Sequence, residues 1–195
     1  MILAYLILAH LLGDFIFQPS KLVLWKMKSK KGILVHVLVH FILSSILLIP
    51  YLINGHLWLL IVAFGLSFVH FWIDEAKINF DLKNDEKVLP FLLDQLMHLL
   101  TIIVAYSLIQ SFTINLPNTA FYKVYLDVRL TAFFAFIVFV TTVVEIFHFT
   151  RAREKNGATK LKIDTNKMLT RVIIFTFIYG AFIIASFYAE WARLL

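Results

Sequence analysis

The feature that most constrains the fold is a series of six long apolar runs separated by short polar stretches. The runs cover about residues 2–17, 32–53, 57–74, 89–112, 129–150 and 168–191. A helix that crosses a bilayer needs about 20 mostly apolar residues. Hydrophobic residues make up 61% of the chain and charged residues only 15%, whereas soluble domains are about a quarter charged. We therefore expect an all-α polytopic membrane bundle of about six transmembrane helices, forming a single integral membrane domain over residues 1–195.

The basic residues predict how the runs are oriented in the membrane. Segments 18–31, 75–88 and 151–167, which follow the first, third and fifth runs, hold five, three and six of the 18 Lys and Arg residues. By the positive-inside rule these segments are cytoplasmic and both termini lie outside. We expect a multi-pass protein of the bacterial inner membrane. The net charge of +6 then reflects topology, and we expect no nucleic-acid partner.

Histidine and aspartate recur in pairs four residues apart, one pair in each of the first four runs. The pairs are His10 and Asp14, His36 and His40, His70 and Asp74, and Asp94 and His98. Residues at this spacing share one face of a helix. Two pairs lie near the ends of runs that cross the membrane from outside to inside. The other two lie near the starts of runs that cross back. All eight residues should therefore lie at a similar depth, in the cytoplasmic half, where ionisable groups are costly and indicate function.

Imidazole and carboxylate together are ligands for Zn, Mn, Fe or Ni. We expect a divalent metal, Zn before Mn or Fe, held by members of the four pairs. A tetrahedral site uses four ligands, so one metal with supporting groups and a two-metal site both stay open. Asp14, Asp74 and Asp94 are the candidates for catalytic carboxylates, since a spare carboxylate can act as general base. The alternative is a polar network that only fixes helix packing. The chain has no cysteine, which excludes thiolate ligands.

Four further residues are candidates for supporting the site or binding substrate. Gln18 continues the stripe of His10 and Asp14, and Gln95 adjoins Asp94. Glu145 and His148 end the fifth run with Glu-x-x-His spacing, a ligand pattern of helical di-metal bundles. They also adjoin the charged segment that starts at Arg151, so a solvated position is the alternative for this pair.

Four motifs resemble those of a known family. They are LAHLLGDFIFQP (residues 8–19), HVLVH (36–40), HFWID (70–74) and DQLMH (94–98). Together they are similar to a family of bacterial integral membrane proteins designated domain of unknown function 3307, over residues 1 to about 100. The resemblance implies that the eight paired residues, with Gln18 and Gln95, form a shared site, and it implies no activity. A looser similarity links the chain to membrane-bound metal-dependent hydrolases, which also place His and Asp on short helices.

Three classes of function fit this pattern. A metal-dependent hydrolase acting on a lipid or lipid-linked substrate at the cytoplasmic face is the first. A divalent-cation or proton-coupled transporter is the second, although the nearly uncharged outer halves of the runs argue against it. A non-catalytic membrane subunit with a polar packing core is the third. Membrane lipid is the expected partner, and an oligomer stays open.

Overall fold

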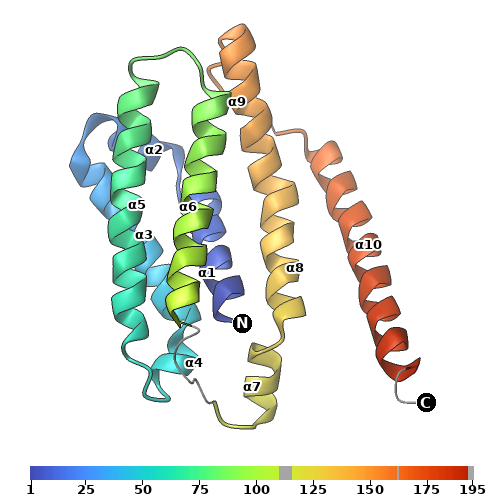
Figure 1. Cartoon of the computed structure of the whole chain (residues 1–195). Coiled ribbons are helices and arrows are strands. Elements are labelled where there is room, and N and C mark those ends of the chain that lie inside the picture. The colour runs from blue at the N-terminus through green and yellow to red at the C-terminus, as the bar shows by residue number, and fades with distance from the viewer. Residues whose placement is uncertain (110–115, 162, 193–195) are drawn as a thin grey trace.

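Every regular element that the structure describes is a helix (Figure 1). The structure is a computed structural model that describes residues 1–109, 116–161 and 163–192, with side chains up to Ser186. The elements are α1 (Ile2–Leu11), η1 (Leu12–Ile16), α2 (Ser20–Lys28), α3 (Lys30–Leu47), α4 (Ile49–Leu52), α5 (Leu59–Asp81), α6 (Val88–Ile109), α7 (Ala120–Tyr125), α8 (Val128–Val138), η2 (Phe139–Val143), α9 (Val144–Asn156) and α10 (Thr165–Ala192). The expected all-α class is confirmed. The end expected for the fourth run, near Phe112, lies outside the described residues.

Among the residues that the structure describes, five helical segments are long and apolar enough to cross a membrane: α3, α5, α6, the continuous α8–η2–α9 and α10. The first run is shorter, because α1 has 10 residues and η1 has 5. At 1.5 Å per residue they reach about 22 Å, below a hydrocarbon thickness of about 30 Å. The chain then bends by 90° into α2. A sixth span is present if this bent pair counts as one.

The first five apolar runs form one bundle, with α10 at its side. Helix α3 packs against α5, α5 against α6, and α1 against α3, α6 and α8. Helix α10 packs beside η2 and α8 (Figure 1) and reaches α9 through the Arg171–Glu145 ion pair, and none of its described side chains is buried. A helix that is apolar on all sides is typical of a membrane span facing lipid.

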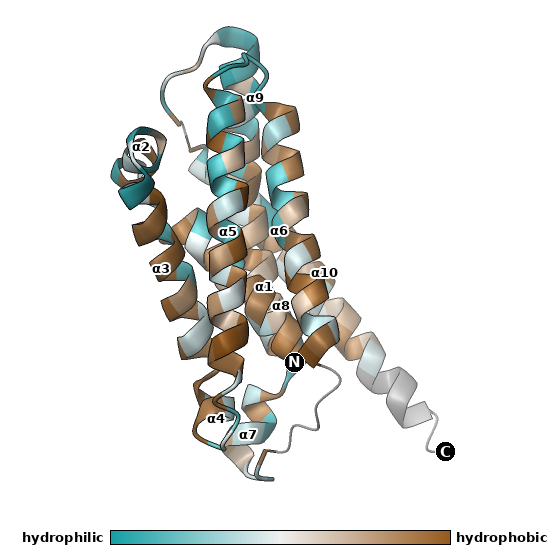
Figure 2. Ribbon diagram, turned by 60° about the vertical axis from the view of Figure 1, so that its left-hand side comes forward, coloured by the Kyte–Doolittle hydropathy of each residue, from teal (hydrophilic) through white to brown (hydrophobic). Residues whose placement is uncertain are grey.

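The two ends of the bundle differ in polarity. Figure 2 shows hydrophilic residues gathered at α2 and at the far end of α9. The opposite end, near α4 and α7, is filled by a buried apolar cluster that includes Leu48, Tyr51, Leu59 and Ile109. Tyr125 of α7 covers it, since its hydroxyl donates to the Leu47 carbonyl at 2.7 Å. That end is therefore sealed by packed side chains.

Three of the expected connections are partly helical. Segment 18–31 contains α2, α5 continues past Glu75 to Asp81, and α7 lies in the connection before Val128. Helix was expected only in the apolar runs, and this was wrong here because α2 is amphipathic and rich in lysine. Its exposed Leu24 and Trp25 are typical of a helix lying in a membrane interface. Two lysines assigned to loops, Lys26 and Lys77, thus lie on helices.

Single cysteines should report the orientation of the bundle, because the natural chain contains none. Lys28 and Lys160 are exposed at the polar end, and Asn118 is exposed at the sealed end. We expect a membrane-impermeant maleimide added to intact cells to label Asn118→Cys and to spare Lys28→Cys and Lys160→Cys until the cells are opened. Labelling of either lysine position from outside would contradict the orientation.

Candidate metal centre

The four helices that carry the pairs turn them toward one another. The set comprises His10, Asp14, His36, His40, His70, Asp74, Asp94 and His98, and we call it the His/Asp cluster. Seven members are buried, and the side chain of Asp14 is only 9% exposed. Residues from α1–η1, α3, α5 and α6 thus meet in one layer, as the sequence predicts.

The Asp14 carboxylate lies at the centre of the cluster. Its Oδ1 atom is 3.0 Å from the Nε2 atoms of both His36 and His40 and 3.5 Å from that of His70. Its Oδ2 atom is 3.7 Å from His10 Nε2. Four imidazoles from three helices therefore converge on one carboxylate.

The turn that carries Asp14 is unusual. Residues Leu12–Ile16 form a π-turn, and such turns occur frequently at functional sites. Gly13 lies in this turn, and a Cβ atom there would be 2.4–2.8 Å from three atoms of the His40 ring. Real side chains do not approach this closely, so only glycine lets the ring lie against the backbone beside Asp14.

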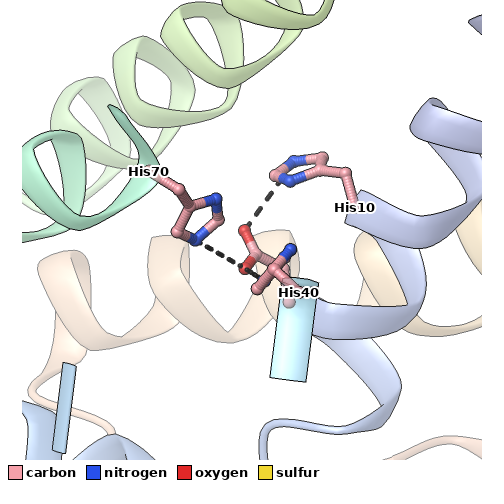
Figure 3. Close-up of side chains that lie close together, drawn as sticks. His10, His40 and His70 are labelled. Carbon is pink, nitrogen blue, oxygen red and sulfur yellow. Dashed lines mark hydrogen bonds and ion pairs between the residues drawn. The ribbon is translucent and has the colours of Figure 1, made fainter. Parts of the chain in front are cut away.

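The nitrogen positions match a shell of metal ligands. His36 Nε2 and His70 Nε2 are 3.2 Å apart, and both also face Asp14 Oδ1, at 3.0 and 3.5 Å. Ligands on a tetrahedral zinc ion with bonds of about 2.05 Å are about 3.3 Å apart. The ligand atoms of His10, Asp14, His40 and His70 all lie within 4.8 Å of one another. Figure 3 shows His10, His40 and His70 pointing toward a common centre from different helices.

Two further groups in the cluster have ligand spacing. They are His36, His70 and Asp74, and Asp14, Asp94 and His98. Each contains a carboxylate that already binds a lysine: Lys26 Nζ is 2.8 Å from Asp74 Oδ2, and Lys77 Nζ is 3.1 Å from Asp94 Oδ2. An ammonium group competes with a metal for the same oxygen, so the group around Asp14 suits a cation best.

Both glutamines contact the cluster. The Gln18 amide nitrogen lies 3.0 Å from His36 Nε2 and 3.2 Å from His36 Nδ1. The Gln95 amide donates to Asp14 Oδ2 at 3.2 Å and to Asp94 Oδ2 at 3.1 Å. Hydrogen bonds of this kind orient ligand side chains and set their basicity.

Glu145 and His148 are placed elsewhere. Glu145 is buried but pairs with Arg171 of α10, and His148 is exposed. The π-turn η2 directly precedes them and alters the angular position of every residue after it, which spacing within an ideal helix cannot anticipate. The structure therefore does not bring this pair into the cluster.

A small cavity adjoins the cluster on the side away from α2. Its volume is about 30 Å³, and it is lined by His10, His40, His70, His98, Leu6, Leu66, Ile102, Ser44, Ser67 and Thr101. One water needs about 10–15 Å³ by this measure, together with polar partners. Imidazole and hydroxyl groups supply those partners, so the cavity suits water next to the cluster.

Sequence reasoning missed three residues of the site. Lys26 and Lys77 were counted only as loop charges, although Lys77 lies three residues after Asp74 and so on a neighbouring face of the same helix. Gly13 adjoins Asp14 and gave no signal of its own, because its role depends on His40 of another helix.

The close approach at Gly13 yields a prediction. Gly13→Ala should displace the His40 ring and destabilise the protein by about 1–3 kcal/mol, the usual cost of overpacking. The matched control is Gly65→Ala in α5, where an added Cβ meets nothing within 4 Å. Thermal unfolding of the purified variants in detergent should give a lower midpoint for Gly13→Ala only. Equal midpoints would contradict the packing described.

The two lysine pairs of α2 and α3 yield a second prediction. Lys26→Met should cost about 3–5 kcal/mol because it leaves the buried Asp74 carboxylate without its ammonium partner. Lys30 is paired with Glu75, and its side chain is 72% exposed, so Lys30→Met should cost about 0–1 kcal/mol. The same unfolding measurement tests both, and similar losses would show that Lys26 is no more than a surface charge.

Comparison with protein families gives one match. It covers residues 2–128, to a family described as protein of unknown function (DUF3307). The range contains the whole His/Asp cluster, both glutamines and both site lysines, and ends before Glu145. Searches of curated proteins and of solved structures found no match, so the looser similarity to metal-dependent hydrolases has no further support. Because the matched range spans more than half of the chain, the protein belongs to the DUF3307 family.

Proposed function

We propose that this membrane protein binds a divalent metal ion, Zn before Mn or Fe, and uses it to hydrolyse a lipid or lipid-linked substrate. His10, Asp14, His40 and His70 would hold the ion. The observation that carries the proposal is the convergence of their ligand atoms within 4.8 Å of one another, from three separate helices, inside an apolar bundle.

The charges of the cluster support a cation. With neutral imidazoles, the charges of Asp74 and Asp94 are offset by Lys26 and Lys77, and Asp14 is left with imidazoles and an amide. A carboxylate in an apolar environment is costly unless it is paired or binds a metal. A divalent ion would neutralise Asp14 and satisfy the nitrogens that compete for it. One protonated imidazole would also neutralise Asp14. That charge state is the one expected of a proton-coupled transporter or a purely structural core.

Hydrolysis needs water, a proton acceptor and access for substrate. A divalent metal polarises substrate oxygens and makes a bound water more acidic. The adjoining cavity has room and polar partners for water. Asp14 belongs to the ligand set in this proposal, which leaves Asp74 and Asp94 as the carboxylates to accept a proton. A site inside the bilayer layer suits a substrate with an acyl or other apolar chain, entering from the lipid or from the polar end beside α2, which we place at the cytoplasmic face.

The sealed end favours chemistry over transport. A transport path would continue from the cluster to the other side of the bundle. Beyond Ser44 and Ser67 the interior is filled by the apolar cluster around Leu48, Tyr51 and Leu59. Among the described residues the interior on that side is apolar, which suits a hydrolase better than a transporter.

Metal content tests the binding part of the proposal. We expect purified wild-type protein to hold at least one equivalent of Zn, Mn or Fe by mass spectrometry, and a His40→Ala/His70→Ala double variant to hold none. His148→Ala is the control, since His148 is an exposed histidine outside the cluster, and it should keep its metal. A metal-free wild type that folds normally would instead support a polar packing core.

Product release tests the hydrolase part. The metal-loaded protein in vesicles would be incubated with a phospholipid, an acylglycerol and a lipid-linked phosphate, and products would be identified by mass spectrometry. We expect one substrate class to be cleaved, and cleavage to stop with a chelator and to fall at least 100-fold in the double variant. Bound metal without cleavage of any of the three classes would contradict the hydrolase and favour the structural or transport role.

A further inference from the structure

We infer that a second divalent cation binds next to the first, between Asp14, Asp94 and His98, so that the cluster is a two-metal centre. This rests on the proposed function, because Asp14 would be shared with the first ion. The ligand atoms of the three residues lie within 4.8 Å of one another.

Two buried atoms in this group face each other as an ion pair without forming a hydrogen bond. Within the part of the chain that the structure describes, Asp94 Oδ1 and His98 Nε2 make no hydrogen bond. They are 3.4 Å apart, and their side chains are 3% and 2% exposed. A buried polar atom without a hydrogen bond is costly. A carboxylate oxygen and an imidazole nitrogen that lie this close without a hydrogen bond are a donor pair for a cation.

The surroundings hold both atoms in place. The other oxygen of Asp94 accepts from Lys77 at 3.1 Å and from Gln95 at 3.1 Å. Oδ1 therefore faces only His98 among these neighbours. The His98 ring stacks on the His70 ring with centroids 3.9 Å apart. Rings and carboxylate are thus fixed before any ion arrives, which lowers the cost of ordering on binding.

The Asp14 carboxylate is placed to bridge the two sites. One of its oxygens faces His36, His40 and His70, whereas the other faces His10 and Gln95. Gln95 also contacts Asp94, so the second oxygen lies toward the second group. Enzymes that use two metals hold them about 3.5–4 Å apart, a spacing that one shared carboxylate can provide.

The two ions should differ in affinity. Lys77 stays bonded to Asp94, and its positive charge repels a cation at the second site. The first site has three imidazoles and a carboxylate without a lysine. We therefore expect the second ion to be the weaker, and to leave first as a chelator is added.

Manganese is the probe for this proposal. Purified full-length protein would be stripped of metal, titrated with Mn²⁺ in detergent and followed by electron paramagnetic resonance, with bound metal counted by mass spectrometry. We expect wild-type protein to bind two ions in two steps and to give the signal of a spin-coupled pair. His98→Ala and Asp94→Asn should bind one ion, with the signal of isolated manganese.

Two controls keep the outcomes distinct. Glu75→Gln changes a carboxylate that also has an unpartnered oxygen but pairs with Lys30 outside the cluster, and it should keep both ions. Size-exclusion profiles would show that each variant is folded. Saturation of the folded wild type at one ion, unchanged in Asp94→Asn and in His98→Ala, would overturn the second site and leave the first intact. Binding of no ion would overturn both.

Discussion

The contact on which the rest of the structure depends is the Asp14 carboxylate held among imidazoles inside an apolar bundle. Between membrane helices there is little hydrophobic attraction, because lipid is as apolar as the side chains. Polar contacts therefore contribute more to helix association. His36, His40 and His70 bond or face one oxygen of Asp14. These contacts set how α1, α3 and α5 lie along one another. The same contacts that fix the packing therefore assemble the candidate metal site.

Lysines from the polar end of the bundle form ion pairs with this interior site. The lysines near the polar end are those that the positive-inside rule uses to orient the chain. Two of them reach into the cluster, Lys26 to Asp74 and Lys77 to Asp94. Lys26 comes from α2, the helix bent by 90° from the first run. A helix suited to the membrane interface is thereby tied to the buried Asp74 carboxylate.

The bundle is asymmetric along its length, and this decides what the cluster is suited to. Apolar and aromatic side chains fill the end near α4 and α7, where Tyr125 bonds the end of α3. The cluster lies toward the polar end, and its small cavity lies between the cluster and this packing. None of the described side chains of α10 is buried. The central bundle of α1, α3, α5 and α6 is complete without it, which agrees with a family match that ends at residue 128.

The sequence by itself determined the helical class, the number of long apolar segments and the common depth of the four pairs. Each of these depends on hydropathy and on spacing within one helix, which are local properties. Tertiary structure alone decided that Asp14 is central, that Lys26 and Lys77 cover the outer carboxylates, and that Glu145 faces Arg171 of α10 rather than the cluster. The π-turns at η1 and η2 and the approach of His40 to Gly13 belong to this second group. They could not be predicted because spacing fixes the face of a single helix, whereas the contacts between faces depend on how the helices are bent and packed together.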